Sequence, residues 1–138
     1  MLASAAREVR ELPDNLPFHV GDIIGTGAFA TYKPCPRQAK RFWLIFSVRI
    51  ARDLNSPQLY AVKFIDKIAA LHGNDPKSRK GQSILFQIAT EIALHRTCAE
   101  HRNVIGFVAT METPVWRWIA MEFAEGGDLF DKIGISIV

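Results

Sequence analysis

The residues Gly25-Thr26-Gly27-Ala28-Phe29-Ala30 are the first in this sequence whose types and spacing could do chemistry. Glycines at this spacing let backbone amides come close to a phosphate group, because no Cβ stands in the way. No helical pattern follows them directly, which argues against a dinucleotide fingerprint and against a P-loop. A glycine turn between two strands would instead cover a bound nucleotide. Taken alone, the run is more often an ordinary turn.

Lys63 stands in the middle of an apolar strand. Alternation places it on the same face as Ala61 and Ile65, where an ammonium group is costly unless an anion meets it. A snorkelling lysine on an edge strand is the ordinary alternative. Glu91, however, borders the apolar stripe of an expected helix and could reach Lys63 if that helix packs on the sheet. The paired lysine would then contact the α- and β-phosphates of a nucleotide.

The third constellation is the apolar strand that ends at Gly126-Gly127. We expect the backbone carbonyl of Glu122 and the backbone amide of Ala124 to meet the edge of an adenine ring. Asp128 would meet a ribose hydroxyl and cap a short helix. By itself the segment is simply a strand followed by a turn.

The elements that must position these residues follow from hydrophobic periodicity. A helix is expected at residues 83–96, where isoleucines repeat at four-residue spacing. Strands are expected at residues 18–24, 48–52, 58–65, 103–110 and 115–123. Residues 71–82 form a polar connection. Short turns between neighbouring strands predict an α+β fold, with about five antiparallel strands and one packed helix.

Composition limits the class of protein. An apolar content of 49% with 22% charged residues is ordinary for a soluble globular domain. The net charge is +3, and the basic stretches 33–41 and 77–80 are interpreted as solvated loops, so no nucleic-acid partner is expected. Cys35 and Cys98 predict neither a metal site nor a disulfide framework, and favour a reducing, intracellular compartment. No segment has the length and apolarity of a signal peptide or a membrane span.

In their order along the chain, these segments resemble the small, N-terminal lobe of the eukaryotic serine/threonine protein kinases. Residues 16–30, 48–67 and 116–133 resemble the checkpoint kinase one family, notably its fungal members. The resemblance covers most of residues 14–133. It implies ATP as the bound nucleotide, with Mg²⁺ only in a complete kinase. It also implies protein substrates for a full-length kinase, a role in the DNA-damage checkpoint, and a nuclear or otherwise cytoplasmic location.

The resemblance assigns a role to each expected ATP-binding position. These are Gly25 and Gly27 in the glycine-rich loop, Ala30 where a third glycine usually stands, Val48 and Ala61 on the two sides of adenine, Lys63 and Glu91 as the ATP-anchoring lysine and its helix partner, Met121 as the gatekeeper, and Glu122 and Ala124 in the hinge. Asp128, expected at the ribose, follows that hinge.

Two departures from the family's pattern stand out. Residues 32–47 separate the glycine loop from Val48, where the family has the two nearly adjacent. We interpret them as an atypical insert that arises from a translated intron or an error in the gene model; a genuine long loop is the alternative. Second, His101-Arg102-Asn103 resembles H-R-D but lacks the acid, and no D-F-G occurs. Neither catalytic residues nor metal ligands are therefore expected.

The sequence thus predicts a flexible N-terminal arm at 1–17, a kinase N-terminal lobe at 18–133 and an aberrant tail at 134–138. We expect an ATP-binding small lobe that ends before the catalytic loop, binds nucleotide weakly and is inactive in phosphotransfer by itself. The alternative is a non-catalytic interaction module or a non-functional fragment.

Overall fold

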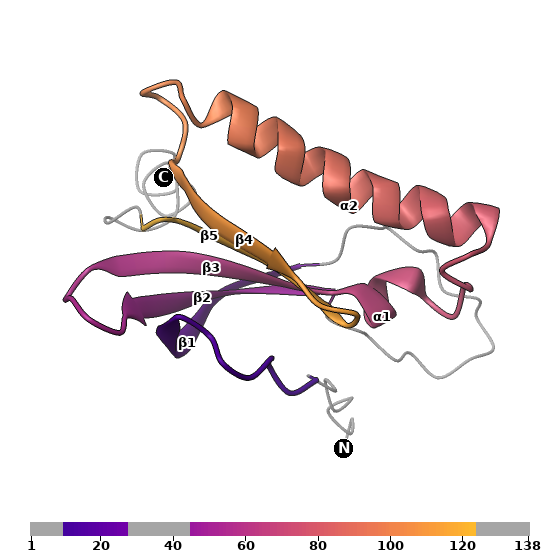
Figure 1. The fold of residues 1–138 in the computed structure, drawn as a ribbon, viewed down its shortest axis with the longest axis horizontal. Helices are drawn as coiled ribbons and strands as arrows, with labels where there is room; N and C mark the ends of the chain where they lie inside the picture. The colour runs from indigo at the N-terminus through magenta and orange to yellow at the C-terminus, as the bar shows by residue number, and fades with distance from the viewer. Residues whose placement is uncertain (1–9, 28–44, 124–138) are drawn as a thin grey trace, which may run out of the picture.

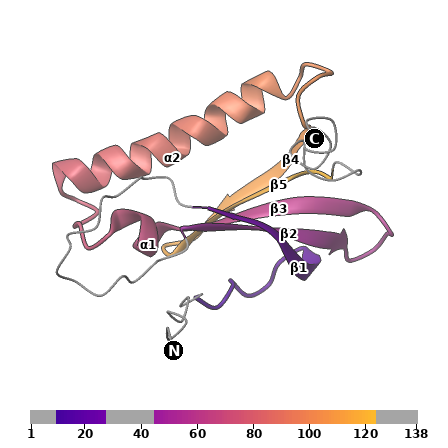
Figure 2. The ribbon, with the colours of Figure 1, turned by 180° about the vertical axis from the view of Figure 1, so that it is seen from behind.

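The computed structural model describes residues 10–27 and 45–123 of the chain. Its strands, β1 (Phe18–Gly27), β2 (Phe46–Asp53), β3 (Leu59–Asp66), β4 (Phe107–Glu112) and β5 (Trp116–Glu122), form one antiparallel sheet in the order β1-β2-β3-β5-β4. The helices are α1 (Lys67–Leu71) and α2 (Arg79–Cys98). Figures 1 and 2 show α2 along one face of the sheet and the segment before β1 along the other. The predicted α+β fold, a five-stranded antiparallel sheet with one packed helix, is confirmed.

The long helix α2 is held on the sheet by isoleucines. Ile88 and Ile92 are buried against Ile65 of β3 and Ile119 of β5. Burial of one such side chain contributes about 1.5–3 kcal/mol. The four-residue repeat that predicted the helix is therefore also the contact that orients it on the sheet.

The start of α2 is fixed by a side-chain cap. The helix begins at Arg79, one turn before the predicted start at Ser83. The hydroxyl of Ser78 accepts a hydrogen bond from the N–H of Gly81 at 3.0 Å, which satisfies a donor that the helix itself leaves unpaired. Apolar periodicity does not indicate this first turn, because Arg79, Lys80 and Gln82 are polar and exposed and the remaining residue is the buried Gly81.

The opposite face of the sheet carries an aromatic core. The buried residues there are Phe18, Ala51, Val62, Phe64, Trp116, Trp118 and Ala120. The rings of Phe18 and Trp118 meet edge to face at 5.1 Å, and those of Phe64 and Trp116 at 6.2 Å. Both faces of β3 are thus covered, because Val62 and Phe64 point to this core while Lys63 and Ile65 point to the face that carries α2.

The segment before β1 lies against this aromatic core. Leu12 packs on it, and the indole N–H of Trp116 donates to the backbone carbonyl of Glu11 at 3.1 Å. These residues belong to the arm predicted at 1–17. Residues 1–9 lie outside the part of the chain that the structure describes.

The short helix α1 is not among the predicted elements, because five residues are too few to display a 3.6-residue period. The carboxylate of Asp66 accepts a hydrogen bond from the N–H of Ala69 and another from Nε of Arg10, both at 3.0 Å. The helix ends at Leu71, and His72 follows as its C-cap with a left-handed φ of 49°. Asp66 therefore joins the end of β3, the start of α1 and the segment before β1.

Strand β2 begins earlier than predicted. It starts at Phe46 instead of Val48, because Phe46 and Ser47 continue the pairing with both neighbouring strands. These two residues belong to the insert predicted at 32–47. Residues 28–44 lie outside the described ranges, as does the tail predicted at 134–138.

Strand β4 is shifted toward the C-terminus relative to its prediction. It begins at Phe107 instead of Asn103 and runs to Glu112, because that is the segment that pairs with β5. The turn that follows is closed by Thr113, whose hydroxyl accepts from the N–H of Trp116 at 2.8 Å.

A group of charged side chains joins the β4–β5 hairpin to α1. Glu112 accepts from Nζ of Lys67 at 2.9 Å and from Nη1 of Arg117 at 3.0 Å. The hydrogen bond from Lys67 has the largest effect on the pKa of Glu112. Together with the positive charges of Lys67 and Arg117 it lowers the pKa of Glu112 below its ordinary value of 4.5, against a smaller opposing effect of desolvation.

We expect Glu112 to make the stability of the domain depend on pH. Because its folded-state pKa is lowered, its contribution is complete above the unfolded-state pKa and is lost as the pH falls through the folded-state pKa. The side chain is 56% exposed, so water screens the contribution to at most about 1 kcal/mol. Glu112→Gln should lower the free energy of unfolding in urea at neutral pH, and the difference from wild type should disappear in acid.

The exposed Glu100 offers a matched control for that experiment. Glu100→Gln should leave the free energy of unfolding unchanged at both pH values. A Glu112→Gln effect of equal size at neutral and acid pH would contradict the prediction.

The first turn of α2 lies directly against the loop before it, at Gly81. A Cβ at this position would clash with the backbone carbonyl oxygen of Asp75. Alanine normally stabilises a helix by about 1 kcal/mol relative to glycine. Here we expect Gly81→Ala to lower the free energy of unfolding by about 1–3 kcal/mol, because backbone must move to admit the methyl group. Ser83→Ala, at an exposed position, should change it by less than about 0.5 kcal/mol. If Gly81→Ala leaves the urea midpoint unchanged or raises it, the predicted loss of stability is wrong.

Candidate functional site

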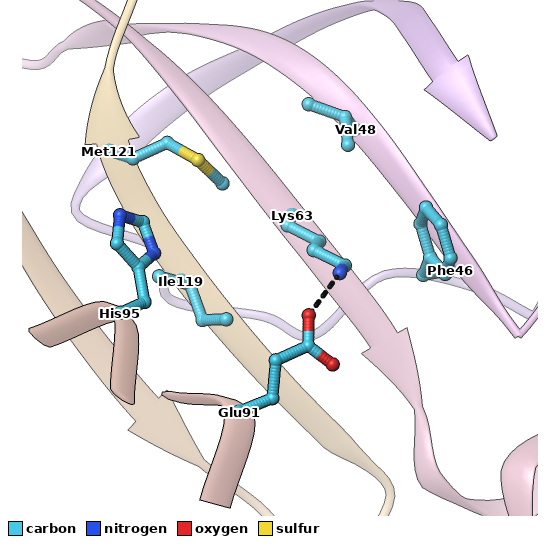
Figure 3. Close-up of a pocket in the computed structure, with 7 residues that line it drawn as sticks. All are labelled: Phe46, Val48, Lys63, Glu91, His95, Ile119 and Met121. Atoms are coloured by element: carbon cyan, nitrogen blue, oxygen red, sulfur yellow. Dashed lines mark hydrogen bonds and ion pairs between the residues drawn. The ribbon is translucent and has the colours of Figure 1, made fainter. Parts of the chain in front are cut away.

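A cavity of about 270 Å³ lies between α2 and the sheet face that the helix covers. It is lined by Phe46, Val48, Lys63, Glu91, His95, Ile119 and Met121, which Figure 3 shows as sticks. Small-molecule sites usually have volumes of about 300–1,000 Å³. This cavity is thus close to the lower limit for such a site.

The sheet register explains why side chains from three strands meet in this cavity. On β3, Lys63 pairs with Val48 of β2 on one side and with Ile119 of β5 on the other. The next residue on the same face, the buried Ala61, pairs with Met121. Paired residues in a sheet share a face, so the structure brings together four sequence-predicted site residues, Val48, Ala61, Lys63 and Met121.

The glycines of the predicted loop end β1 beside this cavity. Gly25 pairs with Val48, and Gly27 pairs with Phe46. A Cβ added at Gly25 would lie 3.8 Å from the Cβ of Val48, which is an ordinary contact distance. The third position of the predicted loop, Ala30, lies outside the described residues.

Lys63 and Glu91 form an ion pair across the cavity. The distance from Nζ of Lys63 to Oε1 of Glu91 is 3.1 Å, and the dashed line in Figure 3 marks it. The lysine side chain is only 15% exposed, whereas that of Glu91 is 47% exposed. A pair with one side open to water contributes at most about 1 kcal/mol to stability. Its consequence is geometric, because it holds an ammonium group at the cavity wall.

The sequence did not identify His95 as a cavity residue. It lies one helical turn after Glu91, and its Nε2–H donates to the backbone carbonyl of Ile105 at 3.0 Å. The imidazole also meets the ring of Phe107 edge to face at 5.5 Å. His95 therefore links the C-terminal half of α2 to the start of β4. The four-residue spacing from Glu91 is the signal that could have placed it here.

Phe46 is the second cavity residue that the sequence did not identify. The centroid of its ring lies 4.3 Å from Nζ of Lys63. Phe46 belongs to the predicted insert at 32–47, so it was not among the predicted site residues. Its alternation with Val48, two residues further along β2, would have placed both on one face.

The expected hinge is described as far as Phe123. The N–H of Glu122 donates to the carbonyl of Gly106 at 2.9 Å, and its carboxylate accepts from the N–H of Gly106 at 3.2 Å. The exposed Glu122 therefore binds the segment before β4. The other expected hinge residues, Ala124 and Asp128, lie beyond the described part of the chain.

The described ranges carry no cluster of three or more histidine, cysteine, aspartate or glutamate side chains that could hold a metal ion. Within the same ranges, neither helix has the length and apolarity needed to cross a membrane.

Relatives of known identity are serine/threonine protein kinases. The chain is 42% identical over 120 residues to Serine/threonine-protein kinase chk1 of Schizosaccharomyces pombe, and 30% identical over 126 residues to Serine/threonine-protein kinase CHK1 of Saccharomyces cerevisiae. It is also 34% identical over 85 residues to Serine/threonine-protein kinase SAPK2 of Oryza sativa. No protein-family model matches the chain.

These matches cover much of this chain and little of each relative. The two checkpoint-kinase matches cover 87% and 91% of this chain, and each covers 20% of the relative. The SAPK2 match covers 62% of this chain and 21% of the relative. The chain thus spans about a fifth of the length of the relatives that it matches.

Proposed function

Because the chain belongs to the serine/threonine protein kinases and has the fold of their N-terminal lobe, we propose that its cavity binds ATP. One observation carries the proposal. Lys63 holds an ammonium group among the apolar sheet side chains that line the cavity, separated by one strand from Gly25 and Gly27 and 3.1 Å from Glu91. An ammonium group in such a position is suited to a phosphate, which it can bind through charge-assisted hydrogen bonds.

The parts of the nucleotide are assigned to different parts of the sheet. The backbone at Gly25 and Gly27 would approach the phosphates, and Lys63 would contact the α- and β-phosphates. The adenine ring would lie between Val48 and Ala61. By the resemblance, its edge would meet the carbonyl of Glu122 and the amide of Ala124, and Asp128 would meet the ribose. Met121, which lines the cavity, would lie at its back.

Magnesium does not fit the residues described for this chain. In protein kinases the ions are held by a catalytic-loop asparagine and a D-F-G aspartate, and neither motif occurs in these residues. We therefore assign no step to a metal ion on this chain. In a complete kinase Mg²⁺ would neutralise phosphate charge.

The role of the whole protein is a proposal by relationship. The similarity to the kinases chk1 and CHK1 supports a protein that phosphorylates serine or threonine in protein substrates. We propose a role in the DNA-damage checkpoint and a nuclear location on the same basis, with the cytoplasm as the alternative location.

A non-catalytic interaction module remains the second candidate. It is favoured by large apolar side chains that α2 exposes on the side away from the sheet, since Phe86 is 71% and Leu94 is 60% exposed. Such side chains are available to a partner. Nucleotide titration separates the two candidates, because an interaction module needs no ATP.

We expect ATP to bind these 138 residues weakly, with a dissociation constant above roughly 100 µM, because the sheet supplies only one wall of a nucleotide site. Lys63→Met should weaken binding at least about tenfold, since it removes a hydrogen bond from a charged donor. Lys77→Met, in an exposed loop, is the control and should bind ATP like wild type. Isothermal titration measures all three, and equal affinities for Lys63→Met and wild type would refute the proposal.

We also expect this polypeptide alone to transfer no phosphate to protein. General base catalysis contributes about 10²–10⁴ in rate, and the aspartate that would provide it does not occur in a catalytic-loop motif here. Radiolabelled ATP with a mixed protein substrate measures the activity, and the Lys63→Met variant controls for a contaminating kinase. Turnover by wild type that Lys63→Met abolishes would overturn this expectation.

A further inference from the structure

We propose that Phe46 covers the ammonium group of Lys63 and competes with nucleotide phosphate for it. The ring centroid lies 4.3 Å from Nζ, within the range in which an aromatic face attracts a cation. This inference rests on the proposed function, since competition requires a cavity that takes a nucleotide. Figure 3 shows the ammonium group between the ring of Phe46 and the carboxylate of Glu91.

The position of Phe46 follows from the sheet register. It is the first residue of β2, and it pairs with Gly27 of β1 on one side and with Ile65 of β3 on the other. Gly27 brings no side chain to this end of the sheet. The ring of Phe46 therefore lies at the end of the cavity that is next to Gly27, the last residue of β1.

The ring is held in place by packing. Phe46 is partly buried against the isoleucine core that holds α2 on the sheet. Because this packing and the contact with Lys63 both hold the ring, covering the ammonium costs little additional side-chain entropy. The proposed effect of Phe46 on nucleotide acts through Lys63, so we regard it as a positioning residue.

Phosphate and the aromatic ring compete for the same donor. Glu91 engages the ammonium group from one direction, and the ring lies over it from another. Charge-assisted hydrogen bonds to phosphate are stronger than a cation–π contact, so nucleotide can displace the ring. Phe46 should therefore weaken nucleotide binding without abolishing it.

A purely structural role for Phe46 makes a different prediction. If the ring only fills space against the isoleucines, the size of the side chain at position 46 matters and its aromatic face does not. Phe46→Leu keeps an apolar side chain and removes the aromatic face, whereas Phe46→Tyr keeps the face. Phe46→Met is a second variant with an apolar side chain and no aromatic face, and it replaces Phe46→Leu if that variant fails to fold.

The first measurement needs no nucleotide. An amine-acylating ester is applied to the 138-residue chain, and mass spectrometry follows the modification rate of Lys63, with the exposed Lys77 as internal reference. Phe46→Leu should raise the rate at Lys63 severalfold, and Phe46→Tyr should leave it unchanged. Phe86→Ala is the matched control, because that phenylalanine lies exposed on α2 outside the cavity lining.

The second measurement titrates ATP into the same variants. Phe46→Leu should bind ATP roughly twofold to thirtyfold more tightly than wild type, the range that cation–π strengths span. Phe46→Tyr and Phe86→Ala should match wild type. A gain in affinity is a result that loss of packing alone would not produce.

The two readouts separate failure of this inference from failure of the proposed function. If Phe46→Leu leaves the acylation rate at Lys63 unchanged, the inference is overturned, whatever the affinity for ATP. If wild type binds ATP and Phe46→Leu binds it no more tightly, competition is refuted and the ATP site stands. If the acylation rate rises but neither protein binds millimolar ATP, the proposed function fails, and competition fails with it.

Discussion

The packing of α2 on the sheet is the interaction on which the rest of this structure depends. Ile88 and Ile92 meet Ile65 and Ile119 in one apolar contact. Glu91 lies between these two isoleucines in sequence, so the contact that holds the helix also sets the reach of its carboxylate. The ion pair with Lys63 is therefore a consequence of hydrophobic packing, and its own contribution to stability is small.

The central strand β3 contributes side chains to both faces of the sheet, because successive side chains point to opposite faces. Val62 and Phe64 belong to the aromatic core, while Lys63 lies on the face that carries α2 and the cavity. A register shift of one residue would place the lysine in the aromatic core and Phe64 in the cavity. Cores on both faces of the sheet thus fix the register, and the register fixes the ammonium group at the cavity wall.

The end of the sheet next to Gly27 is where the structure differs from the predicted start of β2. Strand β2 starts at Phe46, inside the segment that the sequence assigned to an insert, and this places an aromatic ring over Lys63. The strand was predicted to start at Val48. Its start at Phe46 depends on the pairing of Phe46 and Ser47 with β1 and β3, and a strand end has no marker of its own in the sequence.

The sequence by itself determined the elements that are long enough to show a clear hydrophobic period. It also determined the face on which Lys63 and Ala61 lie. Isoleucine spacing determined α2, and alternation put Lys63 with Ala61 on the face that meets the helix. Tertiary structure alone decided the first turn of α2, the existence of α1, the ends of β2 and β4, and the presence of Phe46 and His95 in the cavity. The physical reason is the same for all of these: caps, strand ends and cavity walls depend on hydrogen bonds and contacts with particular partners, and a repeating pattern of apolar residues records burial without naming the partner.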